Sequence, residues 1–140
     1  MNVFEHLKQE HDQAKQIMEQ LKEKPAKREF QQLSKALEQH MGAEERVVYK
    51  AMDKYSELHM HVLESIEEHK VAKRVMGEIG RMEPKDEKWQ AKFKVMKEAI
   101  EHHIEEEEGS IFPEAQRLMG EQRAEELDTK YEEAEKKLAA

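Results

Sequence analysis

The sequence of 140 residues contains no cysteine, only three prolines and five glycines, and few aromatic residues (6%). The absence of cysteine excludes disulfide bonds, thiolate catalysis and thiolate-ligated clusters. Because proline and glycine mark turns, their scarcity argues against a fold built from many short strands. Charged residues make up 40% of the chain, which is typical of long, solvated helices, so we expect an all-α fold.

The sequence also lacks a dense cluster of lysine and arginine and a long apolar run. The formal net charge is -8, so neither nucleic acid nor an anionic membrane is expected as a partner. No stretch approaches the length of a transmembrane helix, and the first residues show no apolar core of a signal peptide. We therefore expect a cytoplasmic protein, and its length suffices for a single domain with a substantial core.

Apolar residues recur at alternating steps of three and four, the spacing of one helix face, in four consecutive segments. These segments predict an all-α, up-and-down antiparallel four-helix bundle over residues 1–119. Pro25 separates the first two helices, Ser56 is expected to cap the third, and Gly109 and Pro113 are expected to disturb the end of the fourth. Residues 120–140 predict an additional amphipathic helix that packs on the bundle or serves association.

Each of the four stripes is interrupted by one histidine at a position that should face the core. Because helices joined by short turns run antiparallel, residues equally far from a turn lie level with one another. Each of these histidines lies roughly 21 Å from its turn at 1.5 Å per residue, so all four should meet in one layer near the middle of the bundle. The four are His11, His40, His69 and His103.

Two of the histidines are followed four positions later by a glutamate on the same helix face, Glu44 after His40 and Glu107 after His103. An aromatic residue follows each histidine after nine positions; we expect these residues, Tyr49 and Phe112, to be core or channel-lining. The segment 10–18 also resembles the segment 68–76. Each half of the chain is therefore predicted to supply half of a pseudo-twofold site.

Four imidazoles and two carboxylates inside a core are unfavourable unless something pairs with them, and a bound cation would do so. A single tetrahedral zinc needs four ligands, so six level ligands predict two metal ions, each held by two histidines and bridged by Glu44 and Glu107. Mixed imidazole and carboxylate ligation favours iron over magnesium or calcium, with manganese or zinc as possible substitutes. We predict two iron ions with a solvent-derived oxygen bridge, leaving a position for an exogenous ligand.

Other polar residues allow competing interpretations. His102 and Glu106 also stand four apart, but they lie about 100° away from the apolar stripe. Lys15 and Lys73 follow metal-layer histidines by one turn and are expected to reach water, although either could place an ammonium group near a bound oxidant. Three further histidines are expected at the surface, namely His6, His59 and His61.

Glu10 and Glu68 precede the two histidines that lack a glutamate four positions later. They could serve as outer-sphere or entry-path groups at the metal site, although a salt-bridged surface face is the ordinary role of such residues. If no metal is bound at all, the alternative is a purely structural bundle with a polar core layer.

The combination of His11, His40-x-x-x-Glu44, His69 and His103-x-x-x-Glu107 resembles the hemerythrin-like HHE cation-binding domain over roughly residues 1–119. The resemblance implies a four-helix bundle with a non-haem di-iron centre that meets O2, H2O2 or NO. Oxygen-carrying hemerythrins have a further histidine where Lys73 stands here. The ligand set is similar instead to hemerythrin-like domains of iron-sulphur-centre repair proteins and iron-sensing regulators.

The resemblance therefore implies binding, and possible reduction, of a small diatomic or peroxide ligand, rather than reversible oxygen carriage. The alternative is a protein without turnover that senses, stores or donates iron through the same site.

Overall fold

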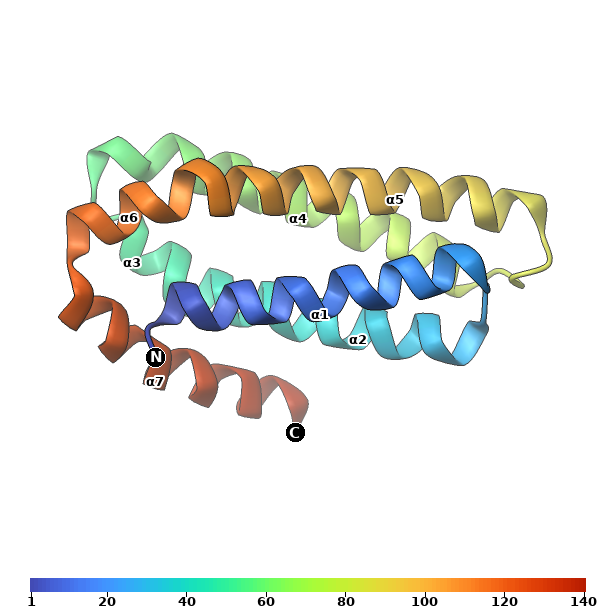
Figure 1. Ribbon diagram of the computed structural model, residues 1–140, viewed down its shortest axis with the longest axis horizontal. Helices are drawn as coiled ribbons and strands as arrows, with labels where there is room; N and C mark the ends of the chain where they lie inside the picture. Colours follow the sequence, from blue (N-terminus) through green and yellow to red (C-terminus); the bar gives the residue numbers. More distant parts are fainter.

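The computed structural model describes residues 1–140 and contains helices and no strands, which confirms the all-α prediction. Figure 1 shows four long helices side by side along one axis, with the chain direction alternating from each helix to the next. These helices are α1 (Val3–Glu23), α2 (Lys27–Ala43), α4 (His59–Gly80) and α5 (Glu87–Glu106).

The local sequence explains where the long helices begin. Asn2 caps α1 through a capping box, in which its side chain accepts from the backbone of Glu5 while the Glu5 carboxylate accepts from the backbone of Asn2. Asp86 caps α5 through its side chain, which accepts from the backbone N–H of Lys88. The prediction that Ser56 caps the third helix is wrong. A 3-10 turn (Ser56–Leu58) precedes α4, and the Ser56 hydroxyl donates to Glu57 instead.

Two of the long helices continue through a wider, π-helical turn. The turn Glu44–Tyr49 joins α2 to α3 (Lys50–Met52), and the turn Glu107–Ile111 joins α5 to α6 (Phe112–Met119). Pro113 falls in the first turn of α6, directly after the wide turn. Both wide turns begin at the glutamates of the predicted metal site, which agrees with the frequent occurrence of such turns at functional sites.

The last helix, α7 (Glu121–Ala139), packs against α1 and α2 (Figure 1). Gly120 connects it to α6 with a φ of 84°, a backbone conformation that disfavours any side chain. The buried face of α7 consists of Ala124, Leu127, Tyr131 and Ala134, which belong to the same apolar cluster as residues of α1. No helix is both long enough and apolar enough to cross a lipid bilayer.

The core consists of two apolar clusters at opposite ends of the long helices. One cluster contains Tyr49, Phe112 and Tyr131, and the other contains Phe30, Trp89 and Phe93. The layer of histidines lies between these two clusters along the long helices, so it divides the core near its middle.

Candidate metal centre

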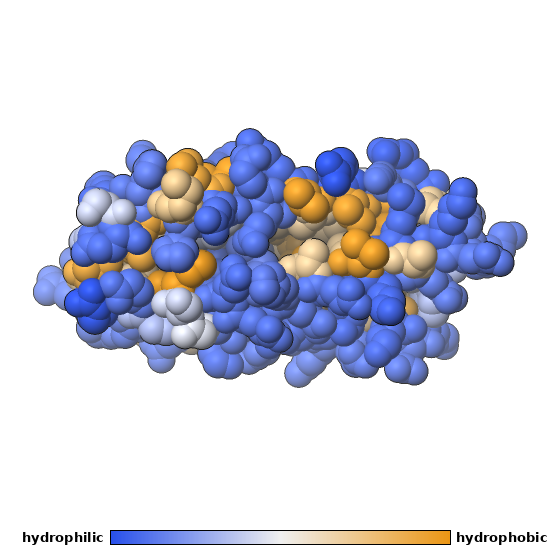
Figure 2. Space-filling view, turned by 90° about the horizontal axis from the view of Figure 1, so that it is seen from above, coloured by the Kyte–Doolittle hydropathy of each residue, from blue (hydrophilic) through white to orange (hydrophobic).

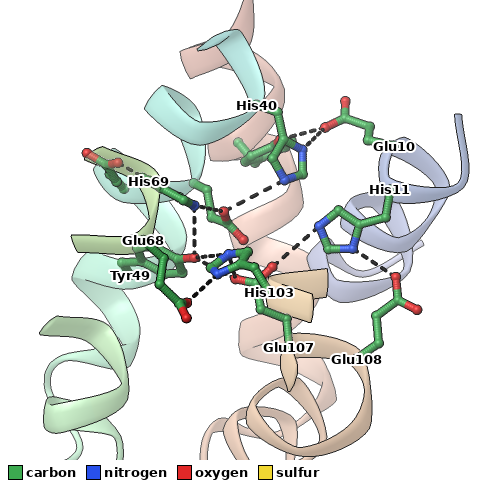
Figure 3. Close-up of polar contacts among 12 residues, drawn as sticks. Glu10, His11, His40, Tyr49, Glu68, His69, His103, Glu107 and Glu108 are labelled. Atoms are coloured by element: carbon green, nitrogen blue, oxygen red, sulfur yellow. Dashed lines mark hydrogen bonds and ion pairs between the residues drawn. The ribbon is translucent and has the colours of Figure 1, made fainter. Parts of the chain in front are cut away.

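The structure brings all six predicted residues into one layer, with one histidine from each long helix (Figure 3). Five of the six are buried, and the His103 side chain is 13% exposed. His11, His40 and Glu44 each offer a ligand atom within 4.8 Å of the others, and Glu44, His69 and His103 do the same. Glu44 therefore belongs to both groups. Glu107 lies opposite, with its Oε1 3.4 Å from His11 Nε2 and its Oε2 3.3 Å from His103 Nε2.

The Nε2 atoms of the histidines face the two carboxylates. Glu44 Oε1 lies 3.2 Å from His69 Nε2 and 3.7 Å from His40 Nε2. Each glutamate thus stands between two histidines that come from different helices. This arrangement can place a carboxylate oxygen and two imidazole nitrogens around each of two cations.

The Nδ1 atoms of the same histidines face outward, and each lies within hydrogen-bond distance of a second carboxylate. Because a carboxylate can only accept, Nδ1 must carry the proton, which leaves the Nε2 lone pair of a neutral imidazole directed into the centre. The four outer pairs are His11 with Glu108 (2.8 Å), His40 with Glu10 (2.8 Å), His69 with Glu45 (2.7 Å) and His103 with Glu68 (2.6 Å).

The outer carboxylates follow a rule that the sequence analysis recognised only in part. The residue before His11 or His69 supports the histidine of the next long helix, so Glu10 and Glu68 are not the ordinary surface groups that we preferred. Glu45 and Glu108 were not predicted. Their signal is the second glutamate in each Glu-Glu pair, next to the inward-facing residue.

Three carboxylate oxygens in this layer have no hydrogen-bond partner, namely both oxygens of Glu44 and Oε1 of Glu107. Both side chains are completely buried. A buried carboxylate without a partner is strongly unfavourable, so these oxygens require either a cation or protons on the neighbouring imidazoles. The residues therefore fit a metal centre, because the unpaired oxygens and the inward Nε2 atoms converge on the same space.

Tyr49 contributes to the site directly, beyond the core or channel-lining role that the sequence suggested. Its hydroxyl donates to Glu107 Oε2 at 2.5 Å, and its ring stacks on His69 with a centroid separation of 5.3 Å. Burial, together with the negative charges of Glu44 and Glu107, raises the pKa of Tyr49 well above its ordinary value. The phenol therefore stays protonated and acts as a donor.

The equivalent residue in the other half is Phe112, which stacks on His11 with a centroid separation of 6.2 Å but carries no hydroxyl. This difference explains why Glu107 has one donor whereas both oxygens of Glu44 have none. The aromatic rings of Tyr49 and Phe112 occupy equivalent positions in the two halves of the chain, but only Tyr49 has a hydroxyl that can donate. The two halves of the centre are therefore chemically different.

Without a cation, protons on the histidines balance the buried carboxylates. Burial alone would lower the pKa of His103, but the hydrogen bond and charge of Glu107 outweigh it and raise that pKa to about 10. The pKa values of His11 and His69 are raised for the same kind of reason, by Glu107 and by Glu44 respectively. A metal ion would displace these protons.

The competing pair is excluded as an inner ligand pair. His102 and Glu106 contact each other at 2.9 Å on the surface, where their side chains are 66% and 45% exposed. Lys73 is exposed, as expected, and its ammonium group lies 3.8 Å from Glu45. Lys15 is half-buried and forms no ion pair.

His59 and His61 are exposed, as expected. The surface prediction for His6 is wrong, because α7 covers this residue and the imidazole contacts Asp128 at 2.7 Å. The burial of His6 depends on the packing of α7 against α1. The spacing of apolar residues in the first helix does not predict that packing.

An all-helical protein with a buried layer of imidazoles and carboxylates belongs structurally to the metal-binding helical proteins. The family model described as the hemerythrin HHE cation binding domain matches residues 2–115, and the chain belongs to that family. A comparison with curated proteins and a comparison with solved structures found no match.

Replacing Tyr49 with phenylalanine removes the only hydroxyl that donates to Glu107. We expect Tyr49→Phe to destabilise the metal-free protein by about 1.5–3 kcal/mol, because the lost hydrogen bond is to a buried charge. Urea denaturation measures this difference. Tyr55→Phe is the matched control, since Tyr55 is half-buried and forms no side-chain hydrogen bond. Equal stabilities of the two variants would contradict the role of Tyr49.

Proposed function

We propose that the six inner residues bind two iron ions, and that the loaded centre binds and reduces a small oxidant such as O2, H2O2 or NO. The observation that carries this proposal is the group of three unpaired, buried carboxylate oxygens beside the histidine Nε2 atoms. The proposed ligands are His11, His40, Glu44, His69, His103 and Glu107.

The chain's own residues would support such a centre in three ways. The outer carboxylates hold the Nδ1 protons and so fix the direction in which each imidazole presents Nε2. Tyr49 donates to Glu107 and thereby restrains that carboxylate. The apolar cluster that contains Tyr49 and Phe112 covers one side of the layer and shields that side from water. When bound, the iron ions would supply the electrons and an open coordination position.

Two histidines for each ion leave more open positions than a five-histidine site would. The residue four positions after His69 is Lys73, whose ammonium group points toward Glu45 and is 41% exposed, so it cannot replace a further imidazole. This favours reduction of an oxidant over reversible oxygen carriage.

The second candidate is iron sensing, storage or donation without turnover. The position of the outer carboxylates favours it. Each of them contacts the outer nitrogen of a layer histidine and is also accessible to solvent. The Glu68 side chain, for example, is 39% exposed while it contacts His103. Such groups would give iron a short acidic route between solvent and the inner ligands.

The adjacent residues His102 and His103 provide a matched test of metal binding. After iron-replete expression, we expect about two iron ions per chain in the unmodified protein and in His102→Ala. In His103→Ala, affinity should fall by at least about 10- to 100-fold, the loss that is typical even when an outer-sphere partner is removed. Elemental analysis with optical spectroscopy measures both. Less than about one metal ion per chain in the unmodified protein would contradict the proposal.

Reactivity separates the two candidate functions. The reduced, iron-loaded protein is prepared anaerobically and then mixed with H2O2, with O2 or with NO, in the presence of an external reductant and an iron chelator. Reduction of a small oxidant predicts many turnovers per site without transfer of iron to the chelator, and the same rate in His102→Ala. Rapid loss of iron with no more than one turnover would reject the oxidant-reducing function and favour iron donation.

A further inference from the structure

A cavity of about 420 Å³ adjoins the histidine layer between α1, α2, α4 and α5. All four layer histidines line it, whereas Glu44 and Glu107 do not. The cavity is therefore distinct from the space between the two carboxylates. It extends from the histidines toward the end of the molecule that contains Pro25.

Small side chains create this space. Each of the four helices contributes one alanine to the lining, three or four residues from its layer histidine, and hence about one helical turn away. These residues are Ala14, Ala36, Ala72 and Ala99. On the other side of the layer, the corresponding space is filled by the rings of Tyr49 and Phe112, which stack on His69 and His11.

The cavity reaches solvent, and its rim is partly apolar. Val71 and Ala99 line it and are exposed at the surface of α4 and α5, with 45% exposure for Val71. Figure 2 views the molecule from the side of α4 and α5 and shows a hollow near its middle, with apolar residues inside and at the rim. A ligand can therefore enter without passing between the inner carboxylates.

The size of the cavity exceeds what a diatomic molecule or peroxide needs. A dry apolar cavity of roughly 150 Å³ holds benzene, so a space of about 420 Å³ has ample room for an aliphatic chain of roughly eight carbon atoms. The value of about 420 Å³ also falls within the range of pockets that bind small organic molecules.

The chemistry of the lining restricts the ligand class. The deep part is aliphatic, with Ile17, Leu33, Leu37 and Ile100, and it contains no phenylalanine, tyrosine or tryptophan. No lysine or arginine lines the cavity, whereas four glutamates do, including Glu67 and Glu135. The imidazoles at the inner end, even when protonated, already face Glu44, Glu107 and the four outer carboxylates, so the carboxylates outnumber them. An anion would therefore meet an excess of negative charge, and any charged group would lose hydration in the aliphatic part.

We propose that this cavity binds an uncharged aliphatic molecule of medium chain length, with one end against the histidine layer. Its occupation goes beyond the proposed reaction with a small oxidant and does not require a metal ion. A molecule bound there would lie beside the face of the imidazoles that is remote from Glu44 and Glu107.

Titration with 1-octanol tests the proposal, with the full chain followed by methyl NMR or calorimetry in the metal-free and the iron-loaded states. We expect saturable binding of one molecule per chain in both states. Octanoate, which has the same chain length and a negative charge, should bind at least roughly 10-fold more weakly. Iron content is measured on the same samples, so failure of metal binding is recognised separately from failure of octanol binding.

Two alanines on α5 supply matched variants, because both are exposed but only Ala99 lines the cavity and Ala91 does not. Ala99→Leu should weaken octanol binding by roughly 10- to 100-fold, because the added carbons occupy space that the ligand needs, whereas Ala91→Leu should change it less than about twofold. The deeper variant Ala72→Leu should abolish binding if it folds normally by circular dichroism. Absence of saturable binding, equal affinities of the two α5 variants, or octanoate binding as tightly as octanol would overturn the proposal.

Discussion

The structure depends on two carboxylates, Glu44 and Glu107, that are completely buried between four imidazoles. Burial of such groups is tolerated only where charge of the opposite sign lies close by, whether protons on the histidines or bound cations. In the metal-free state, protons on the histidines balance the carboxylates, as the raised pKa of His103, about 10, indicates. The oxygens of Glu44 have no hydrogen-bond partner, which favours a bound cation as the functional state of the layer.

Much of this arrangement follows from the sequence, because it obeys the helical period. The stripe positions of His11, His40, His69 and His103 and the four-residue spacing to the glutamates identify the residues that the structure brings together. The helix directions follow from the short turns. The wide turn that begins at Glu44 was not predicted, since an added residue in a helical turn has no signature in a pattern of apolar positions. Gly109 and Pro113 predicted a disturbance where the second wide turn lies, although not its π-helical form.

The roles of the outer carboxylates could not be predicted from the helical period. Glu10 and Glu68 were named as possible outer-sphere groups only because each precedes a layer histidine, and Glu45 and Glu108 were not predicted as site residues. All four are half-exposed, like many other glutamates of this chain. Their roles depend on which histidine of a neighbouring helix lies across from them, which is a matter of helix rotation and packing. His6 is a similar case, because only the docking of α7 buries it. Tyr49 was placed correctly in the core, but its hydroxyl finds Glu107 only through the tertiary fold.

The most direct test of metal binding in this layer is an anomalous-difference map from crystals of the iron-loaded protein, recorded at the iron absorption edge. We predict two peaks, one for each pair of histidine Nε2 atoms, both within coordination distance of Glu44 and Glu107. A map with no peak in this layer, or with a peak only at the half-buried group of His6, Glu10 and Glu135, would contradict it.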